Sequence, residues 1–232
     1  MDIELLRFRA STIQKVRSFF DGHGYLEVDT PLLSPDLIPE SCLEVFETSR
    51  LFPAGSRGEA RPYWLIPSPE IWMKKLIARH GQSIYQICRC FRNGESSGRY
   101  HSPEFTMLEY YTMDANYRDS IAITEELFSR LGDEEALRPP FQQISMEEAF
   151  ARWAGFDLYK AASQAGGMEE EARRLGLNPP PAMDTGALYD LIFIDKVEPA
   201  LPRERPVVLI DYPAFVPCLA KKNGKTVERW EL

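Results

Sequence analysis

The sequence predicts an α+β fold in which an antiparallel sheet is flanked by helices. Two runs of residues, 84–92 and 103–111, alternate their side chains between two faces and are joined by a polar loop, as the arms of a β-hairpin are. A helix followed by a strand at the N-terminus and a capped helix near Ser68 supply further elements. With 232 residues and 44% hydrophobic content, the chain can bury one sizeable core.

The N-terminal segment predicts a helix and then a strand. Residues 5–21 repeat apolar side chains at helical spacing, and Gly22 and Gly24 end the helix. Residues 25–30 then alternate as a strand does. By itself this pattern also suits an ordinary helix–strand unit.

A second helix is expected to open at Ser68-Pro69-Glu70. Serine is a good N-cap, and proline is a good first helical residue because it has no N–H to satisfy. Glu70 then falls in the first turn, where the helix dipole favours a carboxylate. These structural reasons alone account for the three residues, so a binding role for Glu70 needs support from elsewhere.

The second half of the chain predicts helices and one further strand. Residues 116–131 form an amphipathic pattern, and Ser145 with Glu148 forms a capping box. A helix over 184–191 is expected to lead back to a strand over 207–211, and residues 228–232 resemble the beginning of a strand.

The hairpin carries the side chains that suggest chemistry. Alternation places two sets of residues on one face of each arm: Gln86, Cys88, Cys90 and Arg92 on the first, and Phe105, Met107, Glu109 and Tyr111 on the second. If both faces look the same way, Arg92 suits a phosphate and Phe105 suits a flat base. Glu109 and Tyr111 would accept hydrogen bonds from an amine. The alternative is a hairpin whose charges are merely solvated.

Three stretches of the hairpin resemble motif 2 of the class II aminoacyl-tRNA synthetases, most closely the lysyl branch: Phe91-Arg92-Asn93, Arg99-Tyr100-His101 and residues 103–109. Residues 5–31 resemble motif 1, which forms the homodimer interface in that class. Residues 68–76 resemble a Pro-Glu turn and helix of lysyl-type enzymes. This resemblance implies the class II fold, an antiparallel sheet flanked by helices.

Within the lysyl branch, the chain resembles the stand-alone paralogues that modify translation elongation factor P. Residues 98–101 and 105–109 match that group, and the chain begins almost at motif 1, without room for an anticodon-reading domain. The resemblance implies activation of lysine or (R)-β-lysine with ATP and transfer to a lysine of elongation factor P. A fragment of a lysyl-tRNA synthetase and a non-catalytic synthetase paralogue remain alternatives, and the choice between α-lysine and β-lysine stays open.

The resemblance also implies a set of site residues. The catalytic residue is Arg92; the ATP-binding residues are Arg92, Asn93, Glu95, His101, Ser102 and Phe105; the substrate-binding residues are Ser68, Pro69, Glu70, Glu109 and Tyr111. The loop departs from the family at Gly94, which replaces an acidic residue, and at Ser102, which replaces an asparagine. Glu95 is therefore the expected acidic residue of the loop.

The same resemblance sets expectations for domains and metals. Residues 1–232 should form a single catalytic domain with a variable helical insertion over about 114–190. The glycine-rich motif 3 and the ligands of Mg²⁺ are expected beyond Leu232. The chain is therefore expected to be a fragment that lacks part of the site, and the alternative is a naturally shortened relative that has lost it.

Composition limits the partners. The net charge of −8 and a pI near 5.1 argue against broad binding of nucleic acid, so tRNA is not an expected acceptor. The N-terminus lacks a signal-peptide pattern, and no apolar run approaches membrane-spanning length. Four cysteines without a Cys-x-x-Cys pair, and only three histidines, argue against zinc and predict no metal ligands in this chain. Reduced thiols and a cytoplasmic location are expected.

Overall fold

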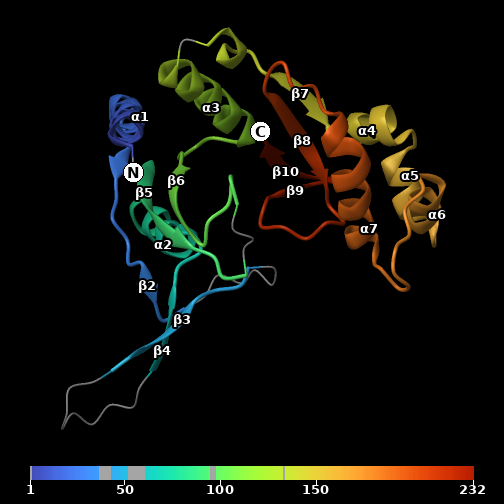
Figure 1. The fold of residues 1–232 in the computed structure, drawn as a ribbon, viewed down its shortest axis with the longest axis horizontal. Helices are drawn as coiled ribbons and strands as arrows, with labels where there is room; N and C mark the ends of the chain where they lie inside the picture. Colours follow the sequence, from blue (N-terminus) through green and yellow to red (C-terminus); the bar gives the residue numbers. More distant parts are fainter. Residues whose placement is uncertain (1, 37–42, 52–60, 95–97, 133) are drawn as a thin grey trace. The chain divides into compact units, whose positions relative to one another are not determined.

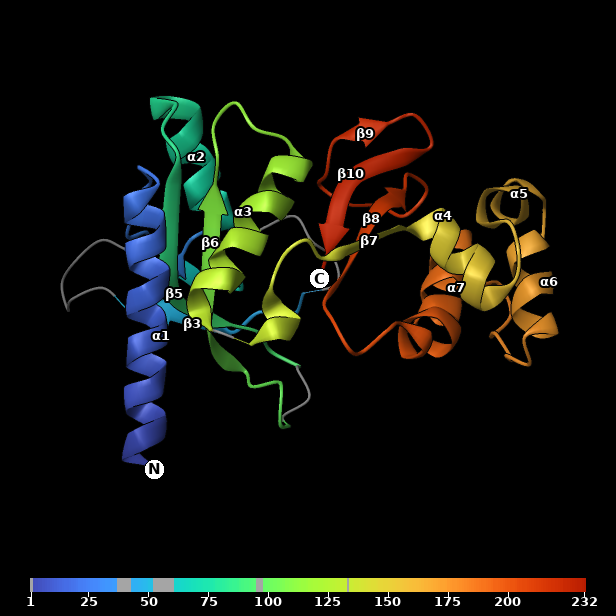
Figure 2. The same ribbon diagram turned by 90° about the horizontal axis from the view of Figure 1, so that it is seen from above.

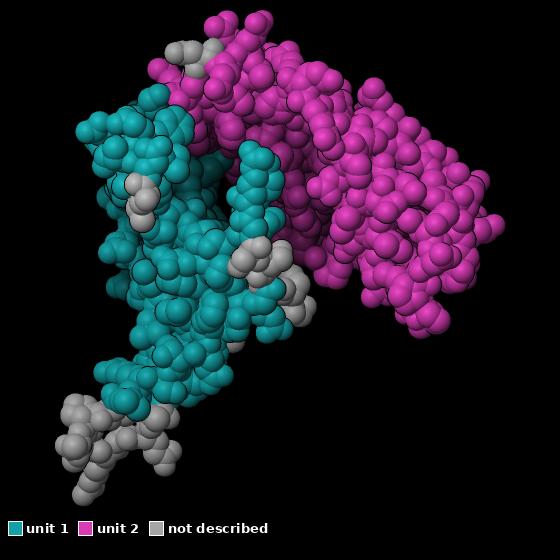
Figure 3. Space-filling view, viewed as in Figure 1, with its two compact units in different colours: residues 1–114 teal, residues 115–232 magenta. Residues whose placement is uncertain are grey.

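The computed structural model describes residues 2–36, 43–51, 61–94, 98–132 and 134–232. The chain divides into two compact units, residues 1–114 and 115–232 (Figure 3). Both units mix helices with mainly antiparallel sheets, which confirms the predicted α+β class (Figure 1). The strands of the described residues are divided among three small sheets, whereas the sequence predicts one.

Unit 1 contains two helices and six strands in its described part. In chain order these are α1 (Ile3–Gly22), β1 (Leu26–Glu27), β2 (Leu33–Ser34), β3 (Glu47–Arg50), β4 (Arg61–Leu65), α2 (Glu70–His80), β5 (Ile84–Phe91) and β6 (Glu104–Tyr111). The strands form two sheets with the orders β1-β5-β6 and β2-β4-β3. The expected strand over 25–30 is confirmed only as the short β1, which runs parallel to β5.

Helix α1 covers one face of the β5–β6 hairpin, and it lies beside β5 in both ribbon views (Figure 1, Figure 2). Phe20 of α1 is fully buried, and its ring stacks on that of Tyr85 with 4.9 Å between centroids. Tyr110, which is paired with Tyr85 across the hairpin, contacts the same ring at 5.0 Å. Because neighbouring side chains along a strand point to opposite faces, the alternate residues of the hairpin lie on the face away from this aromatic cluster.

Unit 2 contains a four-stranded sheet with the order β7-β8-β10-β9 and a group of short helices. The elements are α3 (Tyr117–Leu131), η1 (Glu135–Leu137), β7 (Gln142–Ser145), α4 (Met146–Ala149), η2 (Phe150–Ala154), α5 (Leu158–Ser163), α6 (Gly167–Arg174), α7 (Thr185–Ile192), η3 (Phe193–Val197), η4 (Glu198–Ala200), β8 (Val207–Pro213), β9 (Lys222–Asn223) and β10 (Thr226–Glu231). β7 runs parallel to β8, and β10 runs antiparallel to both β8 and β9.

The core of unit 2 lies between its helices and β8. Phe150, Leu158 and Ile192 are fully buried there. A smaller cluster joins Ile121 of α3 to Val208 of β8. The buried position of Ile121 agrees with the amphipathic pattern predicted for residues 116–131.

The helix boundaries predicted for this half of the chain agree with the structure to within a residue or two. α3 begins after a capping box formed by Asn116 and Asp119. Ser145 accepts a hydrogen bond from the backbone N–H of Glu148, as the predicted cap requires. Asp184 caps α7 in the same way, through the backbone N–H of Ala187.

The division into units bears on the expected insertion. The boundary at Asp114 coincides with the residue near which the helical insertion is expected to begin. Unit 2 continues past residue 190 and includes β8, β9 and β10. The single catalytic domain with an insertion over about 114–190 therefore stays a prediction.

Candidate active site

The pairing of β5 with β6 decides which side chains share a face. Opposite each other stand Gln86 and Glu109, Cys88 and Met107, and Cys90 and Phe105. Directly opposed residues of an antiparallel pair project to the same side. The two predicted faces are therefore one face, the one turned away from α1.

Arg92 follows the last residue of β5 and lies over the ring of Phe105. Its backbone N–H donates to the carbonyl of Pro103 at 3.0 Å, which fixes the chain at the mouth of the hairpin loop. The guanidinium carbon is 5.2 Å from the centroid of the Phe105 ring, a cation–π distance. The Nε atom is buried and finds no hydrogen-bond partner among the described residues. A buried guanidinium N–H without an acceptor suits an anionic ligand that supplies one.

Glu109 is the carboxylate of this face, and two hydroxyl groups hold it. Ser68 Oγ donates to Oε2 at 2.6 Å, and the Tyr111 hydroxyl donates to Oε1 at 2.7 Å. Burial raises the pKa of Glu109, and these two hydrogen bonds oppose the rise without cancelling it. Burial and the charge of Glu109 together raise the pKa of Tyr111 as well, so its phenol stays protonated. Three of the predicted substrate-binding residues are thus brought together.

Ser68 also joins this carboxylate to the start of α2. Ser68 Oγ accepts a hydrogen bond from the backbone N–H of Glu70 at 3.1 Å. The helix begins at Glu70, with Pro69 in the N-cap position, so the predicted boundary is one residue early. The Glu70 carboxylate forms an ion pair with Lys74, one turn along α2. The structure leaves the amine-binding role of Glu70 and Pro69 as a prediction.

Gln86 belongs to this face and was not predicted as a site residue. It is 1% exposed and lies opposite Glu109. Thr30 Oγ1 donates to its Oε1 at 2.9 Å, while its Nε2 has no partner among the described residues. The alternation along 84–92 already placed Gln86 on the same face as Arg92, and that signal could have included it.

The remaining predicted ATP-binding residues lie on the hairpin loop. Asn93 is exposed, and its Oδ1 accepts a hydrogen bond from the N–H of Gly94 at 3.0 Å. His101 and Ser102 are exposed. Glu95 lies outside the described residues. The roles of these four side chains stay predictions.

The described residues of this face offer no set of oxygen ligands for Mg²⁺. No group of three or more His, Cys, Asp or Glu side chains in the described part of the chain is placed to hold a metal ion. The two carboxylates nearest the candidate site are engaged, Glu70 with Lys74 and Glu109 with two hydroxyls. These residues therefore do not by themselves fit a Mg²⁺ site.

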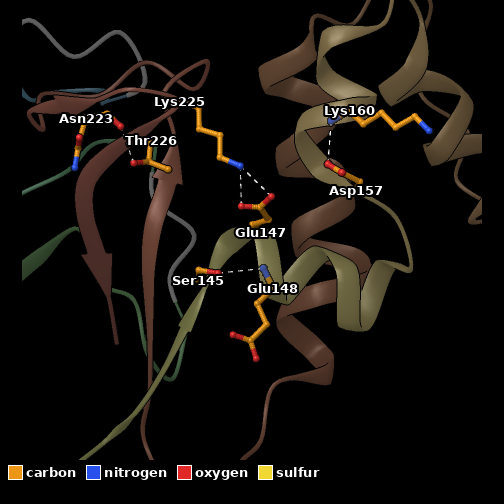
Figure 4. Close-up of polar contacts among 8 residues, drawn as sticks. All are labelled: Ser145, Glu147, Glu148, Asp157, Lys160, Asn223, Lys225 and Thr226. Atoms are coloured by element: carbon orange, nitrogen blue, oxygen red, sulfur yellow. Dashed lines mark hydrogen bonds and ion pairs between the residues drawn. The ribbon is translucent and has the colours of Figure 1, made fainter.

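Unit 2 carries a separate open pocket of about 680 Å³. Lys225 Nζ donates to both carboxylate oxygens of Glu147, at 2.9 and 2.8 Å, as Figure 4 shows. The same nitrogen lies 4.0 Å from the centroid of the Tyr159 ring. Burial, with help from Glu147 and Asp211, raises the pKa of Tyr159 to about 12. Lys225 and Glu147 of this pocket thus compensate each other's charge.

Among the helices in the described part of the chain, not one combines the length and the apolar character that crossing a bilayer requires.

Known proteins with similar sequences show the family of this chain. Residues 3–231 match the family "tRNA synthetases class II (D, K and N)". The elongation factor P--(R)-beta-lysine ligase of Photobacterium profundum is 35% identical over 236 residues, which cover 99% of this chain and 70% of that protein. The protein of the same name from Haemophilus influenzae (strain PittGG) is 33% identical over 233 residues, 99% of this chain and 69% of the relative.

A third relative of that name, from Proteus mirabilis, is 33% identical over 229 residues, 97% of this chain and 68% of its own length. The family match spans nearly the whole chain, and the resemblance inferred from the hairpin motifs is confirmed. The chain belongs to the class II tRNA synthetase family (D, K and N).

Proposed function

We propose that this protein activates lysine or (R)-β-lysine with ATP as an adenylate and transfers it to a lysine side chain of elongation factor P. One observation carries the proposal. A single hairpin face holds a buried guanidinium N–H, on Arg92 over Phe105, for which the described residues supply no acceptor, and a largely buried carboxylate, Glu109. The names of the relatives, elongation factor P--(R)-beta-lysine ligase, agree with that pair of groups.

The phosphate side of the site is formed by Arg92 and Phe105. The Phe105 ring offers a flat surface for the adenine base. The cation–π contact with the same ring holds the Arg92 guanidinium in position. When the substrate carboxylate attacks the α-phosphorus, negative charge grows on the phosphate oxygens. The Nε–H of Arg92, which has no acceptor in the described part of the chain, is a donor already in place for that charge.

The amine side is formed by Glu109 with Ser68 and Tyr111. Burial makes the ionised Glu109 costly, and a substrate ammonium group would offset that cost. Glu70 lies near enough to raise the pKa of Glu109 further, while Lys74 acts in the opposite direction. Two carboxylates next to each other suit a substrate that carries two amino groups, as lysine and β-lysine do.

The reaction has two steps. In the first, a carboxylate oxygen of the amino acid bonds to the α-phosphorus and pyrophosphate leaves. In the second, the acceptor amine attacks the activated carbonyl carbon, AMP leaves, and the amine loses a proton to solvent. Magnesium would neutralise phosphate charge in the first step, but because the described residues do not fit it, we assign it no ligand here.

Two further features of the proposal concern assembly and location. We place a homodimer interface on residues 5–31, because Leu5, Phe8 and Leu26 expose 63%, 70% and 57% of their surface. Exposed large apolar side chains on one helix and the adjoining strand are a common mark of an interface.

Cys88, Cys90 and Cys218 are free thiols, which supports a cytoplasmic location.

Amino-acid-dependent exchange of pyrophosphate into ATP tests the activation step. In the full-length gene product, lysine or (R)-β-lysine should stimulate exchange more than any other amino acid. Glu109→Gln should raise the KM for the amino acid and leave the KM for ATP nearly unchanged, since Glu109 serves the amine and not the phosphates. Exchange that does not depend on either amino acid would refute the proposed substrate.

A further inference from the structure

Three sulfur atoms lie together in the middle of the hairpin face. Cys88 Sγ and Cys90 Sγ are 3.8 Å apart, and Cys90 Sγ is 4.0 Å from Sδ of Met107. The register explains the cluster, because Met107 stands directly opposite Cys88 and Cys90 is the next residue of β5 on the same face. The mechanism proposed above uses none of the three sulfurs.

These distances are those of ligands around one metal ion. A sulfur ligand lies about 2.3 Å from a bound ion, so two ligands are about 3.8 Å apart in a tetrahedral site and about 4.0 Å apart in a trigonal one. The two sulfur–sulfur distances fall on these values. Within each of these two pairs, the sulfur atoms therefore need little movement to share an ion.

We propose that Cys88, Cys90 and Met107 form a binding site for a soft monovalent metal ion, with Cu(I) as the probe. Thiolate and thioether sulfur prefer soft ions, whereas Mg²⁺ and Ca²⁺ require oxygen. A structural zinc site uses four ligands from cysteine, histidine or carboxylate. This cluster has two of that kind, and its third ligand is a thioether.

This site departs from the absence of metal ligands that the sequence predicts. The spacing Cys-x-Cys alone gives two ligands, and the third comes from the opposite strand. Pairing of β5 with β6 is needed to bring Met107 to the two thiols, and no spacing rule within 84–92 reveals it.

The surroundings suit an ion that enters from the open face of the hairpin. Cys90 is fully buried, while Cys88 and Met107 are half-buried and leave the cluster reachable. Binding forms two thiolate–metal bonds and one thioether–metal bond, and two thiol protons go to solvent. The resulting group carries one negative charge, and Arg92, two residues beyond Cys90, offers a positive charge nearby.

A bound ion would also affect the reaction, and this consequence alone rests on the proposed function. The cluster lies between Phe105 and Glu109 along β6, that is, between the surface proposed for the base and the carboxylate proposed for the amine. An ion there would occupy space between the two substrates. Cu(I) is therefore expected to inhibit amino-acid-dependent pyrophosphate exchange, and binding itself requires no activity.

Anaerobic titration of the 232-residue chain with Cu(I), held by a chromophoric chelator of known affinity, tests the site directly. We expect one ion per chain and an X-ray absorption spectrum with sulfur ligands only. Cys88→Ser and Cys90→Ser should each weaken binding by at least about tenfold, the lower end of what loss of even an outer partner costs a metal site. Met107→Leu should weaken it less, because the thioether is the uncharged ligand.

Cys218→Ser is the matched control, because Cys218 is a free, half-buried thiol of unit 2, outside the cluster. It should leave the affinity and the stoichiometry unchanged. Binding that survives in the Cys88→Ser/Cys90→Ser double variant, or that is lost in Cys218→Ser, overturns the proposal. So does a wild-type spectrum with oxygen or nitrogen ligands, a result that does not depend on whether any variant folds. If Cu(I) binds as expected but exchange is not inhibited, the site stands and the placement of the substrates is wrong.

Discussion

Stability alone does not explain the surroundings of the Arg92 side chain. A buried polar atom without a partner costs about 1–3 kcal/mol, and Arg92 Nε is such an atom in the described structure. The stacking on Phe105 offsets part of this cost but supplies no acceptor. A ligand phosphate would supply one.

Replacing Arg92 by alanine should therefore slow adenylate formation by about two to three orders of magnitude, the scale for loss of one preorganised transition-state donor. Arg92→Lys keeps the charge but loses the planar fork, so it should recover only part of the rate. Amino-acid-dependent pyrophosphate exchange in the full-length gene product is the assay. A change of less than about threefold in Arg92→Ala, against that scale, would remove Arg92 from the mechanism.

Glu109 gives a prediction for pH. The ordinary pKa of a glutamate is about 4.3, and burial raises the pKa of Glu109 in the folded protein. The folded state therefore holds this proton more tightly than the unfolded chain does. The stability that Glu109 contributes is fully present below about pH 4.3 and is lost as the pH rises through the raised value.

The free energy of unfolding of the wild type should accordingly fall, relative to Glu109→Gln, as the pH rises above about 4.3. Urea unfolding at several pH values measures this difference. Glu104→Gln is the control, because Glu104 is an exposed carboxylate on the same strand. A difference that grows in the opposite direction would show that the hydroxyls of Ser68 and Tyr111 outweigh burial.

At the scale of single residues, alternation placed Arg92 on one face of its arm and Phe105 with Glu109 on one face of the other, because side-chain direction in a strand has a fixed period. The register of the hairpin was needed to show that these two faces are one. Alternation could not show that Ser68 reaches Glu109, since that contact joins residues 41 positions apart. It also could not show that Met107 reaches Cys90, which depends on the register of the hairpin.

Among the elements, the start of α2 connects stability to the site. Ser68 Oγ accepts from the N–H of Glu70 and donates to Glu109. Ser68→Ala should lower the free energy of unfolding by about 1–2 kcal/mol, because it removes a helix-terminal acceptor and a donor to a carboxylate. It should also raise the KM for the amino acid.

Ser145→Ala separates these two effects. Ser145 accepts from the backbone N–H of Glu148 at the start of α4 and lies in unit 2, outside the candidate site. Its loss should cost about 1 kcal/mol of stability and leave the KM unchanged. Equal changes of KM in the two variants would mean that Ser68 acts only through the stability of the fold.

Helices were predicted better than sheets, because helix signals are local in the sequence and strand pairing is not. Caps and apolar spacing act within a few residues, so α1, α3 and α7 could be placed closely. Strand pairing depends on residues distant in the chain. The parallel pairing of β1 with β5, and the division of the strands into separate sheets, have no local signal.

For the whole molecule, exposed apolar residues on α1 predict its assembly. Phe8 is 70% exposed, and a buried charge at an interface costs several kcal/mol. If residues 5–31 form the homodimer interface, Phe8→Glu should convert the dimer to a monomer in sedimentation experiments. Ile194→Glu is the control, since Ile194 is 62% exposed but lies in unit 2. A wild-type monomer, or equal dissociation in both variants, would contradict this interface.

The charge of the whole molecule bears on its acceptor. The net charge is −8, and the cations of the lysine-rich segment 221–225 are partly compensated within unit 2. Lys225 is paired with Glu147, and Lys221 lies 3.5 Å from Glu228. Affinity for tRNA draws heavily on phosphate contacts, and the paired lysines are poorly suited to make them. A protein acceptor does not depend on such contacts.

A transfer assay with both acceptors side by side tests the central claim most directly. The full-length gene product is incubated with ATP and radioactive lysine or (R)-β-lysine, in the presence of either elongation factor P or tRNA. We predict label on elongation factor P, none on a variant of the factor that lacks its acceptor lysine, and little or none on tRNA. Efficient charging of tRNA with no label on elongation factor P would contradict the proposed function.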